Sequence, residues 1–121
     1  MESIEKELDR LVQMLCINHI CHICGTRSAT AVHHIIGRAN PVLRYDVTNL
    51  LPVCNECHRA IHDKGVDVSG YVHPWRWEYL QRIKNKSYKD ILTFEMQMSE
   101  KEYFKQCRQV LKGLLGENIR N

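Results

Sequence analysis

Two cysteine pairs with the same spacing are the residues of this chain whose types and positions most clearly suggest chemistry. Two residues separate Cys21 from Cys24, and two separate Cys54 from Cys57. This spacing lets both sulfurs of a pair reach one tetrahedral ion at about 2.3 Å, the distance that zinc prefers. Two such pairs supply four ligands and leave no open position. The pattern therefore predicts a structural zinc site rather than a catalytic one.

Two other uses of cysteine compete with zinc. A redox-active dithiol does not explain why there are two pairs. The run Cys54-Asn55-Glu56-Cys57-His58 also matches the C-x-x-C-H signature of c-type haem attachment, which follows export. The acidic, amphipathic start MESIEKELDRL differs from a signal peptide, so we expect a cytoplasmic protein whose six cysteines are metal ligands and core thiols rather than disulfides.

Histidines form a second group of potential ligands, beside the cysteines. His33 and His34 are adjacent and lie between the two cysteine pairs, and His58 and His62 follow the second pair. Residues four apart share one face of a helix, so His58 and His62 can chelate one ion. Because Cys57 immediately precedes His58, a zinc ion at the cysteines would fix the start of that helix. The sequence therefore predicts a second metal site, adjacent to the zinc but separate from it.

The elements that must position these residues follow from hydrophobic spacing. With 121 residues the chain fits one domain, whose modest core a metal ion would help to stabilise. Apolar residues at helical spacing predict a helix at 3–15. The stretches 30–36 and 50–53 are β-prone, with a loop at 37–48 between them, and a helix at 55–63 follows.

Further helices are predicted beyond residue 64. Two glycines and a proline make residues 65–74 a linker, and helices are expected at 75–84 and 88–98. Ser99 and Glu102 form a capping box at the start of a last helix. Its predicted apolar stripe comprises Tyr103, Cys107, Val110, Leu111 and Leu114, and Cys16 and Cys107 are expected to be core thiols.

The order and spacing of these motifs resemble the HNH, or ββα-metal, endonuclease family. The resemblance covers residues 21–62, about a third of the chain, and is strongest to small HNH proteins of phages and prophages. It implies an α+β fold, with a ββα-metal core stapled by a four-cysteine zinc site and flanked by helices. The expected organisation is an N-terminal helix at 1–20, the nuclease core at 21–65 and a helical C-terminal extension at 66–121.

The resemblance also implies a role for each polar residue of the motif. His34 would be the general base that takes a proton from the attacking water, and Asn49 would hold the loop and hairpin that orient it. His33 and His58 would bind the catalytic divalent ion, with His62 as a third ligand. Because neighbours on a strand point to opposite faces, His33 and His34 can serve one site only at a strand end or a distortion.

The implied reaction is hydrolysis of DNA phosphodiester bonds, by nicking, with 3′-hydroxyl and 5′-phosphate products. The ion could be Mg²⁺, Mn²⁺, Ni²⁺ or Zn²⁺, although three imidazoles suit magnesium least. A dimer would be needed to cut both strands together. No apolar run approaches the roughly 20 residues of a membrane span, so no membrane partner is expected.

Basic residues suggest where a phosphate backbone could bind. The formal net charge is +3, and residues 82–89 contain four bases and no acid. Arg38 follows Gly37 just after the histidine doublet and could clamp a phosphate. Solvated surface residues are the alternative in each case. The candidate DNA-binding residues are Arg38, Arg82, Lys84, Lys86 and Lys89.

Two other classes of function also fit the sequence. A zinc-stabilised nucleic-acid-binding module without catalysis would explain the cysteine pairs and the basic stretch, but not the complete set of histidines with Asn49. The C-terminal helices could instead dock a protein partner, such as a phage packaging or recombination factor. That role is compatible with a nuclease.

Overall fold

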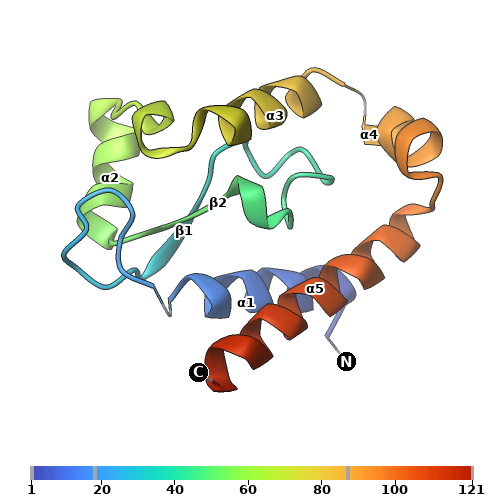
Figure 1. Ribbon diagram of the computed structural model, residues 1–121, viewed down its shortest axis with the longest axis horizontal. Coiled ribbons are helices and arrows are strands. Elements are labelled where there is room, and N and C mark those ends of the chain that lie inside the picture. The colour runs from blue at the N-terminus through green and yellow to red at the C-terminus, as the bar shows by residue number, and fades with distance from the viewer. Residues whose placement is uncertain (1, 18, 87, 121) are drawn as a thin grey trace.

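A short antiparallel hairpin lies at the centre of the molecule (Figure 1). The computed structural model describes residues 2–17, 19–86 and 88–120, and side chains as far as residue 116. Strand β1 (Ala31–His34) pairs with β2 (Leu50–Val53), with His33 opposite Leu51 and His34 opposite Leu50. Every residue of β2 is buried, whereas those of β1 are half-buried. β1 is therefore the strand whose side chains can line a site.

The strand predicted at residues 30–36 is shorter than expected, and that predicted at 50–53 is confirmed. β1 ends at His34 because the next two backbone N–H groups both form hydrogen bonds with Asn49. The Ile35 N–H donates to the Asn49 carbonyl at 3.0 Å, and the Ile36 N–H donates to the Asn49 side-chain oxygen at 2.7 Å. The histidine doublet thus lies at a strand end.

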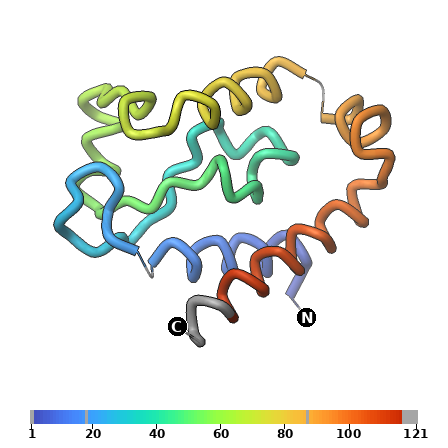
Figure 2. The backbone as a smooth tube through the Cα atoms, viewed as in Figure 1, coloured from blue at the N-terminus to red at the C-terminus, as the bar shows by residue number. Residues whose placement is uncertain are grey.

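The loop between the strands is a packed part of the molecule. It lies between α3 (Pro74–Lys84) and the pair formed by α1 (Ile4–Cys16) and α5 (Glu100–Arg120) (Figure 2). Val42, Leu43 and Tyr45 are at most 2% exposed and belong to the main hydrophobic core. The loop is therefore held in place by burial as well as by hydrogen bonds.

Helices α1 (Ile4–Cys16) and α5 (Glu100–Arg120) lie side by side, and α1 packs against both strands of the hairpin (Figure 1). The Ser3 hydroxyl caps α1 by accepting the Lys6 N–H at 3.2 Å, which confirms the predicted first helix. The Ser99 hydroxyl accepts the Glu102 N–H at 3.2 Å and confirms the predicted start of the last helix.

The buried stripe of α5 differs in part from the predicted one. Tyr103, Cys107 and Leu111 are buried as expected, and so is the thiol of Cys16 on α1. Val110 is 54% exposed, so its predicted place in the core is wrong. Phe104 and Leu115 are buried instead, because α1 packs along a face of α5 that is rotated from the predicted stripe.

Helix α2 (Asn55–Lys64) follows β2 directly and ends at Gly65, whose φ of 65° is the left-handed conformation that glycine adopts easily. The segment predicted as a linker contains a 3₁₀ turn, η2 (Val68–Tyr71), before α3 (Pro74–Lys84). Val68 is buried in a second, smaller core together with Leu51 and Val53. The linker is therefore packed against the hairpin rather than free.

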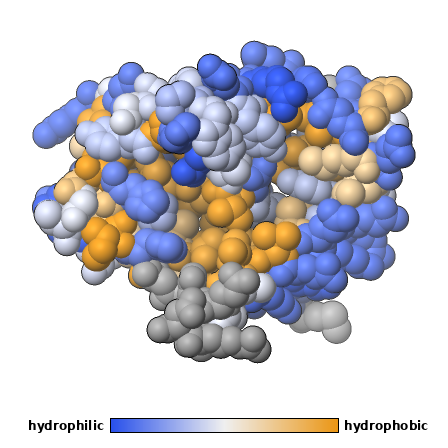
Figure 3. Space-filling model, viewed as in Figure 1, coloured by the Kyte–Doolittle hydropathy of each residue, from blue (hydrophilic) through white to orange (hydrophobic). Residues whose placement is uncertain are grey.

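The helix predicted at 88–98 is α-helical only in α4 (Tyr88–Asp90), after which η3 (Ile91–Met96) is a π-helix. It ends at Gln97, whose φ is 53°. Ile91 and Leu92 at its start are both buried in the main hydrophobic core. Hydrophobic surface is visible in a band between the upper and lower helices (Figure 3). Among the described residues, none of the helices has the length and hydropathy needed to cross a membrane.

Candidate active site

The four cysteines of the two pairs converge at one point. Their sulfur atoms all lie within 4.8 Å of one another. Four sulfurs bound to one zinc ion at about 2.3 Å would lie about 3.8 Å apart, so the cluster fits such an ion after small adjustments. Cys21, Cys54 and Cys57 are buried, and Cys24 is half-buried. These four thiols could hold a structural zinc ion, and convergence of both pairs leaves neither of them for haem attachment.

A backbone N–H group forms a hydrogen bond within each cysteine pair's turn and holds its shape. In the first pair the Gly25 N–H donates to the Cys21 carbonyl at 2.9 Å, in a turn that requires the positive φ of Gly25. In the second, the Cys54 sulfur accepts the Cys57 N–H at 3.4 Å and is the N-cap of α2. The start of α2 and the second half of the cluster are therefore the same structure.

Arg27 is a contact of the cysteine cluster that the sequence spacing does not reveal. Its Nε donates to the Cys54 sulfur at 3.3 Å and its Nη2 to the Cys57 sulfur at 3.8 Å. The hydrogen bond from Arg27 lowers the pKa of the Cys54 thiol, and one from the Thr26 hydroxyl lowers that of Cys24 to about 5. Four thiolates around Zn²⁺ would carry two net negative charges, and the guanidinium would offset one of them.

His33, His58 and His62 form the second cluster, with one ring nitrogen of each within 4.8 Å of the others. The Nε2 atoms of His58 and His62 are 3.2 Å apart. Two nitrogens bound to one ion at about 2.1 Å lie about 3.0–3.4 Å apart, depending on the geometry. The donor set therefore fits a divalent ion, with His33 contributed by β1 and the other two by α2.

The surroundings of His33 and His58 favour the neutral form of their imidazoles. Burial, followed by the proximity of His58 and His62, lowers the pKa of His33 to about 4. Burial also lowers the pKa of His58. A histidine binds a metal through an unprotonated nitrogen, so lowered pKa values leave these two rings ready to bind near neutral pH.

His34 lies beside the cluster, and both residues of the doublet line one cavity of about 440 Å³. The His34 Nε2 is 3.1 Å from the Arg44 carbonyl oxygen. Since a carbonyl only accepts hydrogen bonds, this contact assigns the ring proton to Nε2 and leaves Nδ1 as a proton acceptor. Burial is the largest cause that lowers the pKa of His34, followed by the charge of Arg38.

Asn49 is fully buried and ties together the two ends of the loop. Its amide nitrogen donates to the carbonyls of Ile36 and Leu43, at 3.0 Å each. These residues are close in sequence to His34 and Arg44 respectively. Asn49 therefore fixes the backbone on both sides of the contact between the His34 ring and the Arg44 carbonyl.

The predicted basic residues are divided between two places. Arg38 lines the histidine cavity and is 59% exposed. The other four, Arg82, Lys84, Lys86 and Lys89, are exposed on α3, on α4 and between them, and they do not line the cavity. Arg82 lies over the Tyr79 ring, and Lys86 pairs with Glu95. The structure therefore brings only Arg38 to the histidines.

One acidic residue of the cavity comes from outside the predicted motif. Asp9 of α1 lines the cavity and contacts Arg38 and Arg44. Its position on α1 carries no local signal, because the contact joins residues 35 positions apart in the sequence. The helical spacing of apolar residues in α1 indicates only that Asp9 lies at the edge of the hydrophobic face.

Comparison with known proteins supports the grouping of these residues. Residues 21–64 match the model of the HNH endonuclease family. The chain matches neither a curated protein nor a solved structure. The matched segment contains both cysteine pairs, the hairpin, α2 and all four histidines of the cavity, whereas α1 and α3–α5 lie outside it. Residues 21–64 are therefore similar to an HNH endonuclease domain, and the segments on either side lie outside that similarity.

Proposed function

We propose that the protein is a metal-dependent endonuclease that hydrolyses phosphodiester bonds of DNA. The observation that carries the proposal is that one cavity is lined both by a three-histidine cluster and by His34, whose contact with the Arg44 carbonyl through Nε2 leaves Nδ1 as the ring's proton acceptor. A binding module has no need of either feature. The cavity volume of about 440 Å³ leaves room for a phosphate group and a water molecule.

His33, His58 and His62 would hold the catalytic divalent ion, which would supply positive charge to stabilise the transition state and the leaving oxygen. All three ligands are imidazoles, a donor set that suits Mn²⁺, Ni²⁺ or Zn²⁺ better than Mg²⁺. His62 is the exposed member of the cluster. It is therefore the ligand most easily replaced by water or a substrate oxygen.

His34 acts as the general base in this proposal. Its Nδ1 would take a proton from water as the water oxygen attacks phosphorus, while the other ring proton stays on Nε2 and is donated in a hydrogen bond to the Arg44 carbonyl. Cleavage of the bond to the 3′ oxygen leaves a 3′-hydroxyl and a 5′-phosphate. Asn49 holds the backbone on either side of His34 and Arg44, so that the base keeps its orientation.

Arg38 supplies the most direct recognition of phosphate. Its guanidinium is at the cavity, is 59% exposed and contacts Asp9 only at 3.4 Å, so it can turn toward a phosphate oxygen. Arg82, Lys84, Lys86 and Lys89 would then meet the DNA backbone only beyond the cavity. One site of this kind cuts one strand, so nicking is the expected activity.

A nicking assay on supercoiled plasmid DNA tests the proposal. The wild-type protein and His34→Ala are incubated with Mg²⁺, Mn²⁺, Ni²⁺ or Zn²⁺ in turn, and open-circle product is measured. We expect conversion by the wild type only, with DNA binding and zinc content equal in the two proteins. Binding without cutting by both proteins, on supercoiled, branched and single-stranded DNA alike, would instead identify a zinc-stabilised binding module.

A further inference from the structure

Asp9 makes the closest contact between α1 and the loop that supports His34. Its two carboxylate oxygens accept from the Arg44 guanidinium, at 3.1 Å from Nε and 2.6 Å from Nη2. This two-point geometry is the most directional that an arginine and a carboxylate can form. The side chains are 33% and 27% exposed, so water screens the pair only in part. Asp9 lies outside residues 21–64, which match the HNH family.

Arg44 is held at both of its ends. Its side chain is clamped to Asp9, and its carbonyl oxygen is 3.1 Å from Nε2 of His34. Its neighbours Leu43 and Tyr45 are buried in the core. A rotation of the Arg44 peptide is therefore opposed by burial on both sides and by the ion pair at the side chain. The position of the carbonyl that faces His34 depends on all of these contacts.

We propose that Asp9 is a positioning residue of the active site, which acts through Arg44 to keep the His34 ring oriented with its proton on Nε2. The inference rests on the proposed role of His34 as general base. It makes α1 a functional part of the nuclease rather than only a cover for the hairpin. Arg38, which shares the same carboxylate oxygen at 3.4 Å, is the looser partner and stays available to phosphate.

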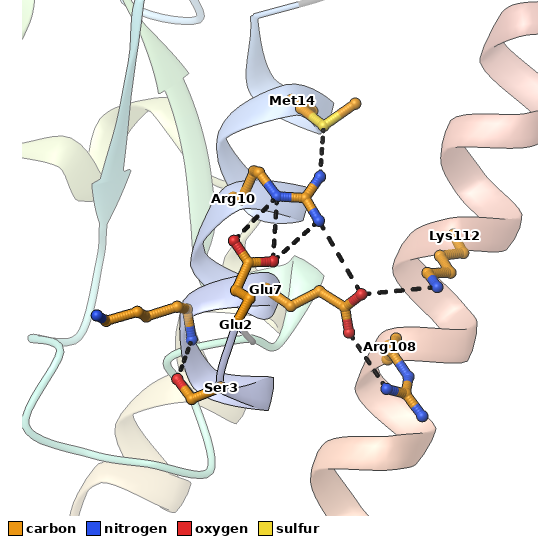
Figure 4. A network of polar contacts seen from close by, with 8 residues as sticks. Glu2, Ser3, Glu7, Arg10, Met14, Arg108 and Lys112 are labelled. Atoms are coloured by element: carbon orange, nitrogen blue, oxygen red, sulfur yellow. Dashed lines mark hydrogen bonds and ion pairs between the residues drawn. The ribbon is translucent and has the colours of Figure 1, made fainter.

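Glu7 provides a matched control on the same helix. It lies two residues from Asp9 but faces α5, where it pairs with Arg108 at 3.2 Å and Lys112 at 3.7 Å (Figure 4). Glu7 does not line the histidine cavity. Glu7→Gln and Asp9→Asn each remove one carboxylate charge and its ion pairs from α1. Only the second change removes a contact with the residue that faces His34.

The test compares nicking kinetics of Asp9→Asn and Glu7→Gln with the wild type. For Asp9→Asn we expect kcat to fall on the order of tenfold with KM nearly unchanged, because orientation of the base rather than substrate binding is lost. Arg44→Gln should give the same loss, and the double variant should be no slower than either single variant. Glu7→Gln should keep the wild-type kcat.

Nitrogen NMR of the His34 ring supplies a readout that does not depend on cutting. The wild type and Glu7→Gln should show a single ring tautomer with the proton on Nε2, and Asp9→Asn and Arg44→Gln a mixture. A wild-type tautomer and kcat in both Asp9→Asn and Arg44→Gln would overturn the inference. If the wild type cuts no DNA, the proposed function fails, and the NMR signals alone decide the role of Asp9.

Discussion

The cysteine and histidine clusters are built on the same helix, yet their surroundings are opposite. Cys54 and Cys57 at the start of α2 are buried, and Arg27 lies against their sulfurs. His58 and His62, within the next turn and a half, face a cavity of about 440 Å³. A cluster with four ligands and a counter-charge is closed, whereas one with three neutral ligands keeps a position for another molecule. The number of ligands and the access of other molecules to the metal thus distinguish a stabilising site from a reactive one.

The histidine cluster depends on the cysteine cluster, whereas the cysteine cluster does not depend on the histidines. The first turn of α2 is held by the Cys54 sulfur, so the orientation of His58 and His62 follows from the cysteine cluster. Nothing in the cysteine cluster is made by a histidine of the cavity. Damage to the cysteines should therefore reach both sites, and damage to the histidines should stay local.

The largest effect is expected from loss of the cysteine cluster. Cys57→Ser should abolish tight zinc binding, for which free energies of about 10–16 kcal/mol are typical of structural sites, and should unfold α2. Nicking would be lost together with the cooperative thermal transition. The zinc content of the purified variant measures the loss of zinc, and circular dichroism measures the loss of helix and of the thermal transition. A folded, active Cys57→Ser protein would show that the two clusters are independent.

His34→Ala should produce the converse result, a large loss of activity without loss of fold. Removal of a general base typically lowers kcat by about 10²–10⁴-fold. The thermal midpoint and zinc content should match those of the wild type, since the His34 ring is only half-buried and makes one hydrogen bond. Plasmid nicking under single-turnover conditions gives the rate. A variant that cuts at the wild-type rate would assign the base to another group.

Arg27→Ala should have an intermediate effect that is confined to the cysteine cluster. Loss of the two N–H···S contacts leaves the thiolate charge less balanced, and changes next to metal ligands typically cost about 10–100-fold in affinity. Competition with a chromophoric chelator measures the zinc affinity. Arg59→Ala, which changes an exposed arginine of α2, is the control and should leave the affinity unchanged.

The smallest effect is expected where α1 meets α5, away from both clusters. Hydrogen bonding by Arg108 is the main cause that lowers the Glu7 pKa from its ordinary 4.5. A lowered carboxylate pKa in the folded state stabilises the fold above pH 4.5, and this contribution disappears as the pH falls through the folded-state pKa. Glu7→Gln should therefore lower the thermal midpoint at neutral pH but hardly at strongly acidic pH. An equal shift at both would exclude the ion pairs as the cause.

The parts of the site that local spacing encodes could be predicted from the sequence. The two cysteine pairs, the i,i+4 histidines of α2 and the short strand at Leu50–Val53 all depend on residues close in the chain, and the structure brings each group together. The residues that were missed depend on distant contacts. Arg27 reaches Cys54 across 27 positions, and Asp9 reaches Arg44 across 35. Periodicity contains no information on such pairs.

The errors in the fold have the same origin. Val110 fits an apolar stripe in the sequence of α5, yet the way α1 packs leaves it 54% exposed. The π-helix at Ile91–Met96 replaces the α-helix predicted there, and its Ile91 and Leu92 are buried in the main hydrophobic core. In each case packing against a distant part of the chain determined the outcome over local preference.

The double use of Cys54, as N-cap of α2 and as a member of the cysteine cluster, links helix nucleation to the supply of zinc. The first turn of a helix is the costly one to form, and here a bound ion would stabilise it. By mass action, the fraction of folded protein would then rise with the free zinc concentration. The amount of folded protein in a cell would thus follow zinc availability, even if a different metal occupied the histidines.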